Sequence, residues 1–306
     1  MEPNFFIVGA PKAGTTSLYR YLGQHPGIFL SPIKEPTFFA PDLAELKFAL
    51  GTSEVDPESL CRYLQGPMDP GFAAVISEWA QYLQLFRNVR HETAVGEGSA
   101  NYLASHAAPA AIHARIPQAR ILLLLRDPVD RLHSQYAEAI SRGDAQGGFL
   151  AWVEQQQSVE ARRHPRLGAV WNGFYAQHLG RFLRYFPAEQ VRCYWYEQLC
   201  SAPGLLVKDV CSFLGVDPSR RIDVSRRHNV TMQPRSRLLI KATAPLAPLV
   251  RRVMPQPVVA ALRTLRTRRP PRMTRAERIA ALSIYQDDIR ELQVLLGRDL
   301  SAWLTA

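Results

Sequence analysis

The sequence predicts a single α/β domain in which a central, mostly parallel sheet is flanked by helices. Short apolar runs, typical of strands buried on both faces, alternate with helical patterns along the chain. The first run, Phe5–Val8, leads into a turn of small residues and then into a helix. With 306 residues, 47% of them hydrophobic, the chain is long and apolar enough to bury a sizeable core.

Local patterns and start signals predict the individual elements. The apolar runs predict strands at 5–8, 94–97, 120–125 and 191–196. Helical spacing predicts helices at 17–22, 73–88, 106–115, 128–142, 170–186 and 203–214. Asp56-Pro57 predicts another helix start, because aspartate caps the first turn and proline suits the first helical position. Thr274 and Glu277 form a capping box, which predicts a last helix at 275–296.

Composition excludes several classes of protein. The hydrophobic content and a charged content of 21% are unlike those of a disordered or collagen-like chain. The apolar run Ile121–Leu125 is far shorter than the ~20 residues of a membrane span. No basic region precedes the first apolar run, so we expect no secretory signal and a cytoplasmic location. The four cysteines are scattered, which predicts reduced thiols and neither a disulfide framework nor a zinc site.

The net charge of +10 is concentrated toward the C-terminus. Residues 220–278 carry 16 of the 37 Lys and Arg residues but only two of the 27 acidic residues. We therefore distinguish a basic helical region at 220–306 from the rest of the single domain at 1–306. Such a region fits a solvated basic face, an acidic acceptor, or the anionic inner face of a membrane. A nucleic-acid partner is not expected, because the sequence contains no DNA- or RNA-reading motif.

The turn Gly9–Ser17 has the composition of a phosphate-binding loop. Its small residues allow backbone N–H groups to approach a phosphate, and the N-terminus of the following helix favours an anion. A nucleotide-triphosphatase loop has lysine and then Ser or Thr directly after its second glycine. Here Thr15 follows Gly14, and Lys12 precedes that glycine by two residues. The turn therefore predicts a phosphate site without magnesium, although an ordinary glycine-rich turn has the same composition.

A second candidate anion site follows the strand at 120–125. Arg126 stands at the carboxyl end of that strand, where open α/β sheets bind their ligands. Pro128 begins a helix, and Ser134 lies two turns into it. The guanidinium of Arg126 and the hydroxyl of Ser134 are suited to a second phosphate. On its own, the segment also fits a solvated helix start with surface arginines.

Together these segments resemble sulfotransferases. The stretch Pro11–Leu18 resembles their 5′-phosphosulfate loop, and Arg126–Tyr136 resembles their 3′-phosphate motif. Lys34–Phe39 is similar to the loop with the catalytic glutamate in the heparan-sulfate and bacterial branches, and Gly96–Tyr102 is similar to a segment that those branches carry. The resemblance covers residues 4–217 and implies a P-loop-type three-layer fold. The Arg-Lys-Gly triplet of the cytosolic small-molecule branch is missing, and Arg226–Asn229 stands in its place.

The resemblance implies a donor, a base and an acceptor class. The donor would be 3′-phosphoadenosine 5′-phosphosulfate (PAPS), with adenosine 3′,5′-bisphosphate (PAP) as product and no metal. The residues that would contact it are Lys12, Ala13, Gly14, Thr15, Thr16, Ser17, Arg126, Ser134, Tyr196 and Arg227. Lys12 would neutralise the leaving phosphate and Glu35 would take the acceptor's proton, with His25, His91 and His178 as alternative bases. The acceptor would be a hydroxyl of a carbohydrate, glycolipid or small metabolite.

Two other functions remain open from the residues alone. A P-loop kinase would require magnesium and a lysine in the triphosphatase position, which Gly14-Thr15 does not provide. A non-enzymatic protein that binds acidic polymers would depend on the basic residues at 220–278.

Overall fold

Five parallel strands form the central sheet in the order β2-β3-β1-β4-β5. The computed structural model describes residues 1–43, 56–69, 73–157, 168–226 and 272–305, together with the backbone of 233–234 and 267–268. The strands are β1 (Phe5–Gly9), β2 (Ile28–Leu30), β3 (Ala94–Gly98), β4 (Arg120–Leu125) and β5 (Val191–Trp195). Four of them are the predicted strands. Strand β2 has three residues and is too short to show the hydrophobic pattern by which a strand is recognised in the sequence.

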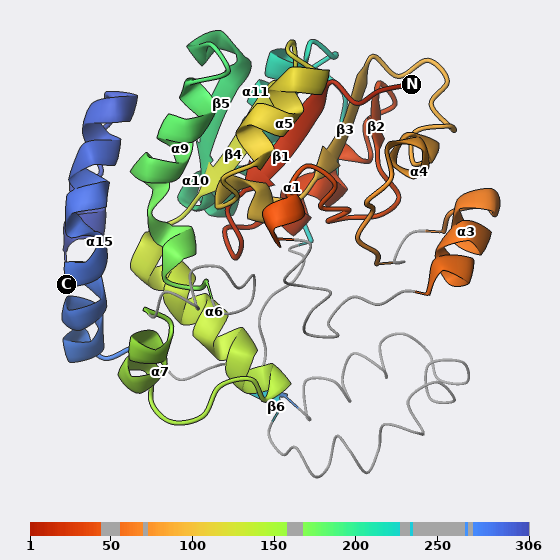
Figure 1. The fold of residues 1–306 in the computed structure, drawn as a ribbon. Coiled ribbons are helices and arrows are strands. Elements are labelled where there is room, and N and C mark those ends of the chain that lie inside the picture. The colour runs from red at the N-terminus through yellow and green to blue at the C-terminus, as the bar shows by residue number, and fades with distance from the viewer. Residues whose placement is uncertain are drawn as a thin grey trace.

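Helices cover both faces of this sheet (Figure 1). They are α1 (Thr15–Leu22), α3 (Pro57–Gln65), α4 (Trp79–Gln84), α5 (Ala108–Arg115), α6 (Pro128–Arg142), α7 (Phe149–Gln155), α9 (Tyr175–Leu183), α10 (Tyr196–Ser201), α11 (Pro203–Leu214) and α15 (Arg275–Leu296). Short 3₁₀ turns occur at η1 (Ala100–Leu103), η2 (Trp171–Gly173), η3 (Ala188–Gln190) and η4 (Ser301–Leu304). Two further strands of two residues each, β6 (Gln233–Pro234) and β7 (Thr267–Arg268), pair in antiparallel orientation.

Alternating strand residues divide the core into two layers. Phe5 and Ile7 of β1 face a cluster that includes Leu18 of α1 and Val210 of α11. Phe6 and its neighbours on the opposite face pack with residues of α5, α6, α9 and α15. The result is the expected three-layer arrangement, with strands buried on both faces. No helix in the described ranges is both long enough and apolar enough to cross a membrane.

Several helices differ from the sequence-based prediction. The helix expected at 73–88 is formed only at α4, and the one expected at 170–186 is divided into η2 and α9. Helices α7 and α10 were not predicted, because each is shorter than two full helical periods. Both helix-start predictions are confirmed. Asp56 accepts a hydrogen bond from the Ser59 backbone, and Thr274 and Glu277 complete the capping box of α15.

The parallel sheet brings distant loops to one edge. The carboxyl ends of all five strands meet there, since every pairing in the sheet is parallel. The turn with Lys12 follows β1, the loop with Glu35 follows β2, and Ser99 follows β3. Arg126 follows β4, and Tyr196 follows β5. This edge is where open α/β sheets bind ligands, so the fold places most of the predicted site residues on one side of the molecule.

Candidate active site

The turn between β1 and α1 has the backbone shape that an anion requires. Gly14 has a φ of 97°, and a Cβ at this position would lie 2.7 Å from Leu199 Cδ2 and 3.2 Å from Tyr196 Cδ2. Only glycine satisfies both the left-handed backbone and the close approach. Within the described chain no side chain caps α1. The first-turn amides of Thr15 and Thr16 are therefore free to bind an anion, which the helix dipole also favours.

Lys12 lies in this turn with its ammonium group turned toward α6. Its Nζ is 3.3 Å from Glu138 Oε2, and 11% of its side chain is exposed. Glu138 Oε1 also contacts Arg142, at 2.8 Å. Burial lowers the pKa of Lys12, and the charge of Glu138 opposes that effect. Sequence reasoning missed Glu138, which lies on the helix that begins after Arg126.

Arg126 links the ends of three strands. Its guanidinium stacks over the Tyr196 ring at 4.6 Å, and its Nη1 donates to the Lys12 carbonyl at 3.4 Å. Residues after β1, β4 and β5 are thereby brought together. Ser134 is half-buried on α6, and in the described part of the chain its hydroxyl makes no hydrogen bond to Arg126.

The other residues predicted to contact PAPS differ in how deeply they are buried. Ala13 is fully buried, and its backbone N–H donates to the Ala10 carbonyl at 3.2 Å, so its amide is already occupied. Ser17 and Thr15 are buried, whereas Thr16 is half-buried at the start of α1. Arg227 lies outside the described residues, and its role stays a prediction.

Glu35 projects from the loop that follows β2. Its Oε2 accepts a hydrogen bond from the Ala100 backbone at 3.0 Å, and its Oε1 lies 2.5 Å from Lys34 Nζ. The backbone N–H of Glu35 donates to the Gly98 carbonyl at 3.0 Å. About a third of the side chain is exposed (32%), so its carboxylate is held in place while still open to solvent. The ammonium of Lys34 is therefore paired with the carboxylate of Glu35, the residue that the resemblance implies as the base.

The N-terminus of α6 is fixed from a distant part of the chain. Asp127 caps this helix by accepting hydrogen bonds from the backbones of Val129 and Asp130. Arg278, on α15, contacts Asp127 at 2.7 Å and Asp130 at 3.2 Å. Arg278 was not predicted, because the partner is 151 residues away in the sequence. The C-terminal helix thus braces the segment that carries Arg126.

The profile of the sulfotransferase family matches residues 3–220. This chain belongs to the sulfotransferase family. Family membership makes it a transferase and implies PAPS as sulfuryl donor and PAP as product. Within the described ranges no three His, Cys, Asp or Glu side chains gather closely enough to hold a metal ion.

Individual relatives of this sulfotransferase agree with that assignment. It is 30% identical over 227 residues to the mouse (Mus musculus) bifunctional heparan sulfate N-deacetylase/N-sulfotransferase 4, covering 71% of this chain and 22% of that protein. It is also 30% identical over 221 residues to the human (Homo sapiens) bifunctional heparan sulfate N-deacetylase/N-sulfotransferase 3, with the same coverage. The chain spans about a fifth of the length of these curated relatives. A solved sulfotransferase from Alicyclobacillus acidocaldarius is 29% identical with a TM-score of 0.72, and 99% of each chain is covered.

The geometry of the sulfotransferase fits a phosphosulfate donor. The turn of Gly14 offers a cradle that a Cβ would fill, directly before a helix N-terminus that no side chain of the described residues caps. Lys12 and Arg126 supply positive charge beside it, and the Tyr196 ring lies under Arg126. Anion binding at such a site rests on backbone amides and the cations around them.

Two of the three alternative bases, His25 and His178, fit structural roles. His25 is buried, and its ring nitrogens contact the Asp217 carbonyl and the Gly27 N–H, each at 2.9 Å. His178 is fully buried against the Trp171 carbonyl, and burial together with the charge of Arg181 lowers its pKa to about 3. A neutral, fully bonded imidazole has no free nitrogen to offer an acceptor. His91 is exposed on the loop before β3.

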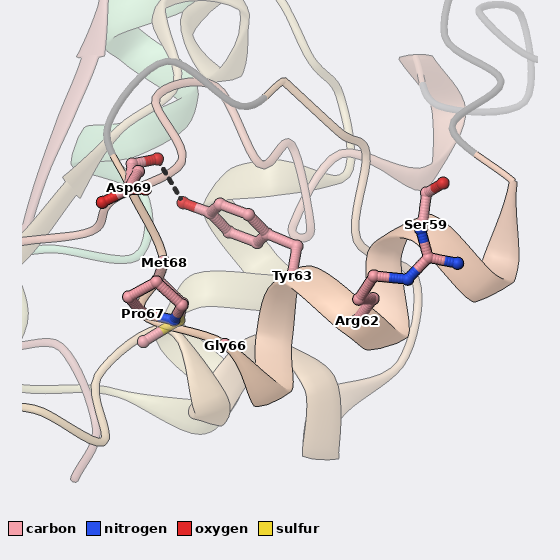
Figure 2. A pocket seen from close by; sticks show the side chains of 7 residues that line it. All are labelled: Ser59, Arg62, Tyr63, Gly66, Pro67, Met68 and Asp69. Carbon is pink, nitrogen blue, oxygen red and sulfur yellow. Dashed lines mark hydrogen bonds between the residues drawn. The ribbon is translucent and has the colours of Figure 1, made fainter.

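A pocket of about 280 Å³ lies beside α3, and Figure 2 shows the side chains around it. Its lining consists of Ser59, Arg62, Tyr63, Gly66, Pro67, Met68 and Asp69. Tyr63 donates its hydroxyl proton to the Asp69 carbonyl at 3.0 Å.

Proposed function

We propose that this sulfotransferase moves the sulfuryl group of PAPS to a hydroxyl of a carbohydrate acceptor, with Lys12 at the donor and Glu35 at the acceptor. The observation that carries the proposal is that the Gly14 turn, Arg126 and the partly exposed carboxylate of Glu35 lie at one sheet edge. A phosphate cradle alone would suit many nucleotides. A carboxylate held at the same edge adds the proton acceptor that transfer to a hydroxyl requires.

The donor would be held by residues that need little rearrangement. The amides of Thr15 and Thr16 and the ammonium of Lys12 would bind its 5′-phosphosulfate. Arg126 would bind its 3′-phosphate, and its stacking on Tyr196 limits the positions that the guanidinium can adopt. PAPS supplies an activated sulfuryl group whose transfer has a loose, in-line transition state, comparable to phosphoryl transfer. Positioning and charge stabilisation are therefore the main tasks of these side chains.

Glu35 would take the proton that the acceptor hydroxyl loses. Its Oε1 contacts Lys34 and its Oε2 accepts from Ala100, and each oxygen keeps a further lone pair for the acceptor. As the acceptor oxygen bonds to sulfur, its proton passes to Glu35 and the sulfur–oxygen bond to the 5′-phosphate breaks. Lys12 would stabilise the negative charge that develops on that phosphate.

Two observations support a carbohydrate acceptor. The curated relatives described above carry heparan sulfate in their names. The pocket beside α3 offers an aromatic ring, hydroxyl groups and both signs of charge, which are the groups that bind a polar ring. Arg62 at its edge would favour an acceptor that is already acidic.

The test combines donor binding with sulfate transfer. We expect PAP to raise the melting temperature and ATP with Mg²⁺ to leave it unchanged, because a ligand stabilises only a protein that binds it. Labelled PAPS is then incubated with heparan-type glycans whose amines are either free or acetylated. Incorporation into the acetylated glycan supports hydroxyl transfer, whereas incorporation into the free amine alone would refute it. Lys12→Ala should abolish incorporation, while Lys208→Ala, on the exposed face of α11, is the matched control.

A further inference from the structure

A buried carboxylate lies beneath the loop that carries Glu35. Glu97, in β3, is fully buried. Its Oε2 accepts a hydrogen bond from Ser99 Oγ at 2.8 Å. Its Oε1 accepts from the hydroxyls of Tyr102 at 2.6 Å and Tyr82 at 3.2 Å. Three hydroxyl protons therefore converge on one carboxylate in the protein interior.

Two of these hydroxyls also hold the Glu35 loop. Ser99 Oγ accepts a hydrogen bond from the Thr37 backbone N–H, and the Tyr102 hydroxyl accepts one from the Phe39 N–H, both at 3.2 Å. Thr37 and Phe39 lie two and four residues beyond Glu35. The Tyr82 hydroxyl comes from α4, and its contact within this group is the one to Glu97. Glu97 is thus joined to the loop by two short bridges.

The loop needs such bridges because its backbone is strained. Glu35 has a φ of 68° and Thr37 a φ of 58°, in the left-handed region that residues with a Cβ avoid. Strained backbone persists only where the surroundings hold it, and it concentrates at functional sites. The same loop is bonded to the end of β3 through the Glu35 N–H and the Gly98 carbonyl. Release of the bridges would allow the loop to relax and the Glu35 carboxylate to move.

The charge state at position 97 sets the direction of the bridges. A hydroxyl has one proton, so a hydroxyl that accepts from a backbone N–H must donate its proton elsewhere. Above its pKa the ionised carboxylate only accepts, and it therefore directs the Ser99 and Tyr102 protons away from the loop. An amide at this position would add two N–H donors, and at least one hydroxyl would have to turn. The Thr37 or Phe39 N–H would then lose its acceptor.

We propose that Glu97 is a positioning residue, whose carboxylate orients the Ser99 and Tyr102 hydroxyls and thereby fixes the backbone that presents Glu35 to the acceptor. This inference rests on the proposed role of Glu35 as the base. A carboxylate is a costly residue in a core, since an apolar side chain of similar volume has no charge to desolvate. Burial, opposed by the three hydroxyls, raises the pKa of Glu97 to about 7, and this shift reflects the cost of desolvating the charged carboxylate.

The two tyrosines provide a matched pair of variants. Tyr102→Phe and Tyr82→Phe each remove a hydroxyl that donates to the same Glu97 oxygen, but only Tyr102 bridges to the loop. We expect Tyr102→Phe to lower kcat by ~10-fold and Glu97→Gln by ~100-fold, because a small displacement of a catalytic group costs that much. The KM for PAPS and the affinity for PAP should stay within about twofold in both, since both side chains are fully buried and cannot reach a bound nucleotide. Tyr82→Phe should retain the parent's kcat.

Amide hydrogen exchange provides a readout that does not depend on an acceptor. The Thr37 and Phe39 amides should exchange faster in Tyr102→Phe and Glu97→Gln than in the parent, and at the parent's rate in Tyr82→Phe. Equal exchange and equal kcat in the two tyrosine variants would overturn the proposal, even if Glu97→Gln fails to fold. A parent that sulfates none of the acceptors would instead refute the proposed function, and that result is seen before any variant is made.

Discussion

Lys12 and Glu138 form an ion pair at the place where the phosphosulfate of the donor is expected, with 3.3 Å between Nζ and Oε2. Arg142 neutralises the other oxygen of the same carboxylate at 2.8 Å. While no anion is bound, the negative charge of Glu138 balances the positive charge of the partly buried Lys12. A phosphosulfate bound by Lys12 would lie close to the Glu138 carboxylate, and like charges repel each other. We therefore expect Glu138 to reduce the affinity for the donor.

Glu138→Gln should consequently bind PAP more tightly than the parent. The amide keeps the shape of the side chain and removes one negative charge near the anion, so we expect a gain of roughly 3–10-fold in affinity. Calorimetric titration of PAP measures it. Glu154→Gln, an exposed change on α7, has the same charge difference and should leave the affinity unchanged. A weaker affinity in Glu138→Gln would show instead that Glu138 orients Lys12 for binding.

Glu35→Gln and Lys12→Ala should fail in different ways. Glu35→Gln removes the base and keeps the side-chain shape, so kcat should fall by ~10²–10⁴-fold while PAP binds as in the parent. Lys12→Ala removes a contact to the reacting end of the donor, so kcat should fall and PAP binding should weaken as well. Steady-state kinetics and PAP titration separate the two patterns. Near-parent turnover in Glu35→Gln would exclude Glu35 as the base.

Arg126→Ala should discriminate between two nucleotides. If Arg126 binds the 3′-phosphate, the variant should lose ~10-fold or more in affinity for PAP, the worth of a charge-assisted hydrogen bond. Its affinity for adenosine 5′-phosphate, which lacks the 3′-phosphate, should change little. Arg90→Ala, an exposed residue before β3, is the control. Equal losses for both nucleotides would mean that Arg126 mainly supports Tyr196 and the Lys12 turn.

The parts of the site that were predictable share a local signal. Lys12 and Arg126 each follow an apolar run, and parallel strands bring such positions to one edge, where Tyr196, which the resemblance implied, also lies. The family resemblance added Glu35, whose loop follows a strand too short to be recognised by its period.

The residues that were missed depend on contacts over long distances in the sequence. Arg278 reaches Asp127 from a helix 151 residues away, and no local pattern relates them. Glu97 did have a signal, since an acidic residue next to apolar strand residues is unusual. Tyr102, in the same segment, is fully buried against Glu97.

Glu97 should also make stability depend on pH. Its pKa is about 7 in the folded protein against 4.5 for an unperturbed glutamate, so between these values the folded state binds more protons than the unfolded state. The free energy of unfolding therefore falls as the pH rises through this window, by on the order of 3 kcal/mol. The groups that face Glu97 are Ser99, Tyr82, Tyr102, Tyr19 and Glu35, and the three tyrosines have raised pKa values outside this window.

Glu97→Gln isolates this contribution. Urea unfolding of parent and variant from pH 4.5 to 8 should show the parent losing stability relative to the variant as the pH rises. Asp288, whose pKa burial raises to about 6, titrates in both proteins and cancels in the difference. Parallel pH profiles would show that Glu97 keeps an ordinary pKa in the folded state.

The last prediction concerns the basic residues at 220–278. It rests on the sequence, because most of these residues lie outside the described ranges. Charge reversal of Arg263, Arg266, Arg268 and Arg269 should raise the KM for an acidic acceptor or abolish binding to anionic liposomes. In the parent either interaction should weaken steeply with salt, since exposed charges are screened over ~10 Å at 0.1 M. The control reverses four exposed charges elsewhere, at Arg20, Arg90, Arg184 and Lys208. If the two quadruple variants behave alike in both assays, net charge alone accounts for the effect, and 220–278 is a solvated basic surface. That outcome would also remove the reason to expect the protein at a membrane face.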